Sequence, residues 1–159
     1  MKRFLIAGVP ATGKTTIGNY LQDKFNFIHF DVESDLINQT IAGGLFWGLE
    51  IDRFIEQIAE GGKNIVVTWG FVCDHQHSLD IIHMLQKKGF KFIWFNAEEL
   101  IARRAFEERG TGNLKDFDTQ MGRIKNLNLN IFDNPVIITT LDNNGRKSKD
   151  EIVEVILKR

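Results

Sequence analysis

Residues 8–15 read GVPATGKT and match the pattern G-x-x-x-x-G-K-[ST], which is typical of a phosphate-binding loop. In such a loop the glycines let successive backbone N–H groups point at one anion. Lys14 adds a charge that reaches the β- and γ-phosphates, and the Thr15 hydroxyl can ligate Mg²⁺. The loop therefore predicts a site for ATP and Mg²⁺. Its expected nucleotide-binding residues are Gly8, Ala11, Thr12, Gly13, Lys14, Thr15 and Thr16.

Three carboxylates follow the second apolar run of the chain, at Asp31, Glu33 and Asp35. Asp31 and Glu33 share one side if the chain stays extended that far. We expect Asp31 to hold Mg²⁺ or to accept the proton of an attacking hydroxyl, and Glu33 and Asp35 to contact the molecule that bears this hydroxyl. The alternative is that Asp31 or Ser34 only caps the next helix.

Residues 34–63 are expected to form the insert that binds the phosphate acceptor. Arg53 is the candidate partner for an anionic group on the acceptor. Phe46 and Trp47 could stack on a substrate ring or pack two short helices together. After the third apolar run, Gly70 lets a ligand approach the backbone, and Trp69 either lines the acceptor pocket or lies in the core.

Arginines gather near the end of a helix expected at 98–109, where Arg103, Arg104 and Arg109 precede a glycine-punctuated loop. Guanidinium groups suit phosphate oxygens and stack on purine rings. We expect residues 103–114 to form a short lid, with Arg109 on the transferring phosphate and Arg123 of the next helix reaching the same phosphates. Exposed helix arginines with no ligand are the alternative.

Other candidates carry less chemistry. His75 and His77 lie two residues apart, so they do not share a helix face, and a metal site that includes Asp74 is not expected. Cys73 has no His or Asn partner at a spacing that suggests a nucleophile. These residues are interpreted as structural or solvated.

The elements that must position these residues alternate along the chain. Short apolar runs predict strands, and amphipathic stretches between them predict helices. This order predicts an α/β fold with a doubly wound, five-stranded parallel sheet and helices on both faces. Ligands of such sheets bind beyond the carboxyl ends of the strands. The expected strands are 3–7, 27–32, 64–72, 90–96 and 135–140, and the expected helices are 14–24, 34–42, 49–60, 76–88, 98–109, 116–129 and 148–158.

Composition sets the outer limits. A chain of 159 residues with 43% apolar residues suits one globular domain, 1–159. No apolar run reaches membrane-spanning length, and the first residues are too short for a signal peptide, so we expect no membrane partner. A single cysteine excludes an internal disulfide and favours the cytoplasm. The net charge of −1 does not favour nucleic acid. A monomer or a homodimer fits these data.

Several segments together resemble the P-loop kinase superfamily of adenylate, shikimate and gluconate kinases. GVPATGKTT resembles its ATP loop, and HFDVESD resembles the shikimate kinase strand that carries an acidic pair. EELIARRAFEERG resembles the adenylate kinase helix that opens the lid, which implies that Arg104 lies against adenine and that Arg109 binds phosphate. DFDTQMGRIKNLN resembles the segment after that lid and implicates Arg123. VIITTLDNNG resembles the last strand and adenine-side loop.

The resemblance has limits on the acceptor side. The insert lacks the pair of arginines with which nucleoside monophosphate kinases bind the acceptor phosphate, and TWGF replaces the triple glycine of shikimate kinase. We therefore expect an ATP-dependent phosphotransferase that acts on a small-molecule hydroxyl, as shikimate and gluconate kinases do. A nucleoside monophosphate kinase, or a nucleotide-binding regulator or NTPase without an acceptor, remains open.

Overall fold

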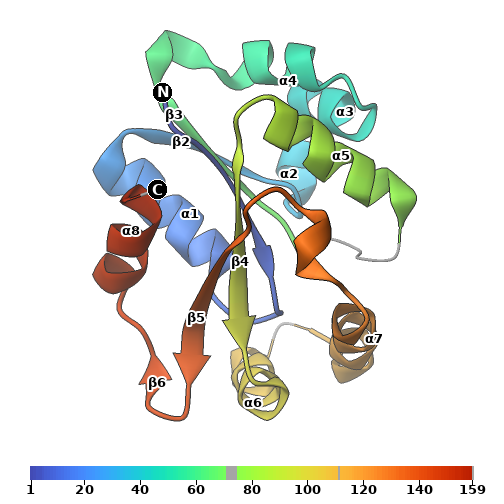
Figure 1. The fold of residues 1–159 in the computed structure, drawn as a ribbon, viewed down its shortest axis with the longest axis vertical. Helices are drawn as coiled ribbons and strands as arrows, with labels where there is room; N and C mark the ends of the chain where they lie inside the picture. The colour runs from blue at the N-terminus through green and yellow to red at the C-terminus, as the bar shows by residue number, and fades with distance from the viewer. Residues whose placement is uncertain (71–74, 111, 159) are drawn as a thin grey trace.

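The sheet is the centre of the computed structural model, which describes residues 1–70, 75–110 and 112–158. Five parallel strands lie in the order β2-β3-β1-β4-β5, and a short sixth strand pairs antiparallel with β5. Figure 1 shows the arrowheads of β1, β4 and β5 at one end of the molecule. The strands are β1 Arg3–Gly8, β2 Phe27–Asp31, β3 Asn64–Thr68, β4 Lys91–Ala97, β5 Val136–Asp142 and β6 Gly145–Arg146.

Helices cover both faces of this sheet, and two more lie beyond the carboxyl ends of its strands (Figure 1). One face carries α1 Lys14–Phe25 and α8 Lys149–Leu157. The other carries α3 Ile41–Trp47, α4 Ile51–Ile58 and α5 Gln76–Lys87. Helices α6 Glu99–Arg109 and α7 Leu114–Lys125 lie past the arrowhead of β4. The shorter elements are α2 Asp35–Asn38 and the 3₁₀ turns Glu60–Gly62 and Leu129–Ile131.

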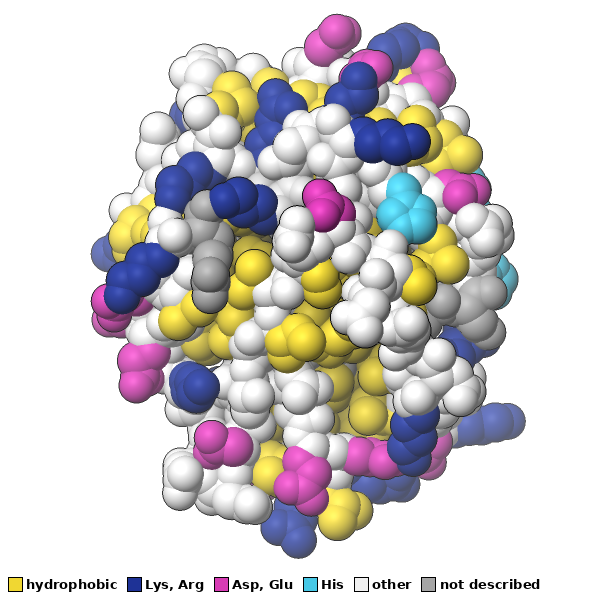
Figure 2. Space-filling model, in the orientation of Figure 1, with side chains coloured by type: hydrophobic (Ala, Val, Ile, Leu, Met, Phe, Trp, Pro, Cys, Tyr) yellow, Lys and Arg dark blue, Asp and Glu magenta, His cyan; other side chains and the backbone are white. Residues whose placement is uncertain are grey.

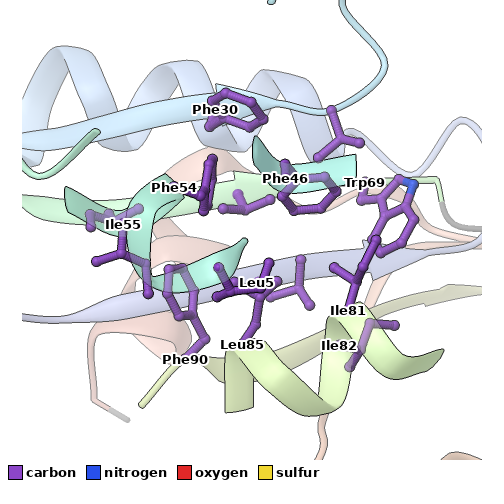
Figure 3. Packing of buried hydrophobic residues seen from close by; sticks show 14 of the residues in the cluster. Leu5, Phe30, Phe46, Phe54, Ile55, Trp69, Ile81, Ile82, Leu85 and Phe90 are labelled. Atoms are coloured by element: carbon purple, nitrogen blue, oxygen red, sulfur yellow. The ribbon is translucent and has the colours of Figure 1, made fainter. Parts of the chain in front are cut away.

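Alternation along β1 explains the two cores. Phe4 and Ile6 are buried against α1 and α8, whereas Leu5 and Ala7 are buried against α3, α4 and α5. Phe30, Phe46 and Phe54 pack ring against ring on the second face, and Figure 3 shows Trp69 beside Phe46 and Ile81 in the same cluster. A sheet with two buried faces needs strands that are apolar throughout, which is the pattern the sequence carries.

The five parallel strands and the helices on both faces confirm the predicted fold, with three local differences. A sixth strand exists because Asn143 and Asn144 turn the chain after β5, and the Asp142 carboxylate accepts a hydrogen bond from the Asn144 N–H at 2.8 Å. Strand β3 ends at Thr68, earlier than predicted.

The third difference is the helix expected at 34–42, which is two helices. Thr40 separates them because its backbone is extended and its hydroxyl caps α3, accepting the Gly43 N–H at 3.1 Å. The apolar segment 43–48, for which no helix was expected, is therefore mostly helix α3.

No helix in the described ranges is long and apolar enough to cross a bilayer. On the face drawn in Figure 2, basic and acidic side chains of the described residues are interspersed and form no continuous basic tract.

Candidate active site

The phosphate loop connects the end of β1 to the start of α1. Gly8 has a φ of 138° and lies so close to β4 that a Cβ there would be 2.1 Å from the Phe95 carbonyl oxygen. Ala11 and Gly13, with φ values of 61° and 88°, complete the turn. Gly13 is the N-cap of α1 and offers no side chain to the helix, so the first-turn N–H groups keep their capacity for an anion.

The C-terminal part of the chain braces this loop. The Thr140 hydroxyl of β5 donates to the Thr12 carbonyl oxygen at 3.0 Å, and the Arg146 guanidinium of β6 donates to the Ala11 carbonyl oxygen at 2.7 Å. Within the loop, the buried Thr12 hydroxyl donates to the Val9 carbonyl oxygen at 2.6 Å. The loop is therefore held in shape by its own side chains and by the far edge of the sheet.

Lys14 lies inside the loop with 9% of its surface exposed. Its ammonium donates to the carbonyl oxygens of Gly8 and Val9 at 3.1 and 3.0 Å. Burial lowers the pKa of Lys14 from 10.5 to about 8; the Glu33 carboxylate opposes this shift, Arg109 adds to it, and Asp31 opposes it. The charges of Glu33, Arg109 and Asp31 therefore all act on the Lys14 ammonium.

Thr15 and Thr16 are exposed in the first turn of α1, where their hydroxyls are accessible. Asp31 ends β2 opposite Thr68 and is half-buried. Its carboxylate accepts the Glu33 N–H at 3.1 Å, and Ser34 makes no side-chain cap to α2. Asp31 thus turns the chain after β2, and helix capping does not account for it.

His29 joins the site although the sequence gave no reason to select it. Its Nδ1 lies 2.8 Å from the Asn19 amide oxygen, and its Nε2 lies 2.8 Å from the Thr68 hydroxyl. Because the amide oxygen can only accept, Nδ1 carries the proton, and the neutral ring accepts the Thr68 O–H at Nε2. Burial lowers the pKa of His29, with Asp31 opposing the shift. Gly18 makes room for the ring.

A cavity of about 250 Å³, here called the inner cavity, opens on the phosphate side of the loop. Glu33 and Gly70 form one wall, and a Cβ at position 70 would lie 2.5 Å from a Glu33 carboxylate oxygen. Lys14 and Arg109 are the positively charged residues of the lining. Helix α7 contributes a second carboxylate, Asp116. The full lining is Gly8, Pro10, Ala11, Lys14, Glu33, Gly70, Phe106, Arg109, Asp116, Phe117 and Gln120.

A second cavity of about 450 Å³, here called the outer cavity, lies between the loop, α6 and the start of α8. Its walls include Ala11, Thr12, Gly13 and Thr16 of the loop region. Three of its cations, Arg146, Lys147 and Lys149, were not predicted from the sequence, although the run RKSK after the NNG turn was a visible signal.

Arg109 is the arginine of α6 that lines both cavities; its guanidinium lies 5.3 Å from the Phe106 ring centroid. Arg104 is exposed and lines neither cavity; Ala105 and Glu108 occupy the facing side of the helix. Arg103 instead ties α6 to α7 by pairing with Asp118.

Arg123 lies one turn beyond Gln120 on α7; it is half-buried and outside both linings.

The structure separates three further candidates from the cavities. Arg53 pairs with Glu50 at 2.5 Å on α4, and its neighbour Asp52 pairs with Lys88 at 2.6 Å, just before β4 begins. Figure 1 shows α4 at the end of the molecule opposite α6. This placement keeps Arg53 away from both cavities, because α4 lies toward the amino end of β4.

Asp35 is exposed in the first turn of α2 and lines neither cavity. Trp69 is 3% exposed and packs edge-on against Phe46 and Trp47, so its ring belongs to the core, as one of the two readings of the sequence had it. Trp47 therefore also packs against protein rings.

No group of three or more potential metal ligands occurs among residues 1–70, 75–110 and 112–158. The imidazole of His77 contacts the Trp47 carbonyl oxygen at 2.9 Å, which is a structural role. Cys73 and Asp74 lie outside the described residues.

Comparison with known proteins agrees with this geometry. The fold and the loop are similar to those of kinases with a phosphate-binding loop. In sequence, the chain is 25% identical over 140 residues to a shikimate kinase of Caldicellulosiruptor saccharolyticus, covering 81% of this chain and 78% of the relative. No family model matches the chain.

Solved structures share the fold. A shikimate kinase from Bacteroides thetaiotaomicron matches with a TM-score of 0.60 and 16% identity over 99% of both chains. A gluconokinase from Sinorhizobium meliloti 1021 matches with a TM-score of 0.60 and 13% identity over 99% of this chain and 90% of the other. A sugar kinase from Janibacter sp. HTCC2649 matches with a TM-score of 0.63 and 14% identity over 99% of this chain and 93% of the other. These likenesses show a fold that the chain shares with a shikimate kinase, a gluconokinase and a sugar kinase.

Proposed function

We propose that the chain transfers the γ-phosphate of ATP to a hydroxyl group of a small molecule. The observation that carries this proposal is the inner cavity, where the cations of the donor side, Lys14 and Arg109, meet the Glu33 carboxylate and Gly70 of the acceptor side. A site that only bound a nucleotide would need the loop but not this second wall.

ATP fits the two cavities in one direction. The nucleoside would occupy the outer cavity, and its polyphosphate would follow the loop from Gly13 toward Lys14, where N–H groups, a buried ammonium and a helix N-terminus converge. Thr16 and Thr12 lie along this path. Arg109, which lines both cavities, would contact the γ-phosphate.

The residues for Mg²⁺ are the Thr15 hydroxyl and the Asp31 carboxylate. Two protein oxygens suit this ion, because Mg²⁺ keeps several waters and takes further ligands from substrate phosphates. When bound, Mg²⁺ would neutralise charge on the β- and γ-phosphate oxygens.

The transfer needs positioning and charge rather than covalent catalysis. The acceptor oxygen forms a bond to the γ-phosphorus while the bond from that phosphorus to the bridging oxygen of ADP breaks. Asp31 lies outside the lining of the inner cavity, two residues before Glu33, and would take the hydroxyl proton, which passes to water. Lys14 and Arg109 stabilise the charge on the transferred group. Closure of residues 103–114 would exclude water, which would otherwise accept the phosphate.

The test is ATP-dependent phosphorylation of a panel of hydroxyl-bearing metabolites and nucleoside monophosphates, followed by ADP release. We expect at least one non-nucleotide acceptor to accelerate turnover, and Lys14→Ala to lower the rate by about 10²–10³-fold with the fold intact. Lys63→Ala, outside both cavities, is the matched control. Preference for a nucleoside monophosphate would replace this proposal with the adenylate-kinase-like alternative. ATP turnover that no acceptor accelerates would reject a phosphotransferase.

A further inference from the structure

The charged residues that line the inner cavity limit which acceptor it can bind. Two carboxylates, Glu33 and Asp116, line it from β2's end and from α7. The two cations in its lining, Lys14 and Arg109, belong to the phosphate loop and to α6. Under the proposed function, the transferring phosphate uses both cations. The charges that remain for the rest of the acceptor are therefore the carboxylates.

The segment on the acceptor side of the cavity adds no positive charge that would offset these carboxylates. Between Asp31 and Asp74 the sequence contains two basic residues, Arg53 and Lys63. Arg53 pairs with Glu50 on α4, and Lys63 immediately precedes β3 at the amino end of the sheet. Neither lines the inner cavity.

Helix α7 adds no cation to the lining. Lys125 pairs with Glu99 at 2.8 Å, and Arg123 lies a turn beyond Gln120, outside the lining. A carboxylate on the acceptor would thus meet Glu33 and Asp116 with no further cation in the described wall of the cavity. Both carboxylates are exposed, so the cost to an acidic acceptor comes from the repulsion between like charges.

We propose that the acceptor is a neutral or cationic polyol, such as a sugar alcohol or an amino sugar, and not a hydroxy acid. The inference rests on the proposed function. Glu33 and Asp116 would accept hydrogen bonds from the hydroxyls that are not phosphorylated, or pair with an ammonium group. Discrimination would come from repulsion of the acid as much as from attraction of the polyol.

Matched acceptors separate charge from shape. Gluconate, glucitol and 1-amino-1-deoxyglucitol share a chain of hydroxyls and differ at the first carbon. Glucuronate, glucose and 6-amino-6-deoxyglucose share a ring of hydroxyls and differ at the sixth carbon. The measurement is kcat/KM for ATP-dependent phosphorylation of each, with product identified by mass. We expect the amine or the alcohol of a set to exceed its acid by at least about tenfold.

The Glu33→Gln variant keeps size and hydrogen bonding but removes a charge. We expect it to narrow the gap between amine and acid in each set, whereas Glu56→Gln, on the exposed surface of α4, leaves the gap unchanged. An acid that is phosphorylated best, or a gap that Glu33→Gln does not change, overturns this inference and leaves the kinase proposal standing. Failure of every acceptor in both sets and in the wider panel rejects the kinase proposal and this inference with it.

Discussion

The substitution Gly18→Ala tests whether His29 is clamped between α1 and β3. An added Cβ at position 18 would lie 2.3 Å from His29 Nε2 and 2.6 Å from two ring carbons. Ordinary contact needs more than about 3.4 Å, so the ring must move by roughly 1 Å. It cannot do so while keeping both of its 2.8 Å hydrogen bonds to Asn19 and Thr68.

The expected change in the free energy of unfolding combines two destabilising terms and one stabilising term. Overpacking a well-filled site costs about 2 kcal/mol. Loss of one hydrogen bond costs about 1 kcal/mol, and Thr68 is 1% exposed, so water cannot easily replace the ring. Alanine in a helix interior gains about 1 kcal/mol over glycine. We therefore expect Gly18→Ala to lower the free energy of unfolding by about 2 kcal/mol, measured by urea denaturation.

Gly122→Ala is the matched control. It lies within α7, and a Cβ there would meet no described atom within 4 Å. The control should gain up to about 1 kcal/mol from helix propensity alone. Combining Gly18→Ala with His29→Ala should remove the clash, so that alanine at position 18 becomes stabilising in that background. Equal stabilisation by Gly18→Ala and Gly122→Ala in the otherwise native chain would refute the clamp.

Three further predictions concern proton and phosphate chemistry. Because the pKa of Lys14 is lowered to about 8, ATP binding at pH 8 should take up about half a proton, seen by calorimetry in buffers of different ionisation enthalpy; uptake that persists in Lys14→Met would assign it elsewhere. The lowered pKa of His29 means that, as the pH falls, this imidazole is protonated in the unfolded chain before it is protonated in the folded one. The free energy of unfolding should therefore decrease as the pH drops below about 6.5, and His29→Gln should make this decrease smaller. An unchanged pH dependence in the variant contradicts the assignment. Asp31→Asn should reduce kcat by about 10²–10⁴-fold with little change in the KM for ATP, and full turnover would mean that Asp31 only turns the chain.

Local signals account for what the sequence predicted well. The P-loop pattern fixes the end of one strand and the start of one helix, so Lys14 and Thr15 could be placed without a structure. Five apolar runs bounded by polar turns predicted the parallel strands. Glu33 and Gly70 were expected near the acceptor, and the structure brings both to the inner cavity.

Residues whose positions depend on tertiary packing were harder to predict. The direction in which α4 leaves α3 puts Arg53 at the wrong end of the sheet for the proposed chemistry, and nothing local encodes that direction. The rotation of α6 decides that Arg109 faces the cavities and that Arg104 does not. His29 becomes part of the site through Gly18 and Thr68, which lie on two other elements.

The bracing of the phosphate loop by β5 and β6 has a consequence for biosynthesis. The Thr140–Thr12 and Arg146–Ala11 hydrogen bonds span 128 and 135 residues, so the loop is completed by segments that are synthesised well after it. Contacts of such separation form late in folding. A nascent chain that carries the whole GVPATGKT pattern but lacks the last strands would hold its loop without these two supports, and nucleotide affinity should rise only when β5 docks.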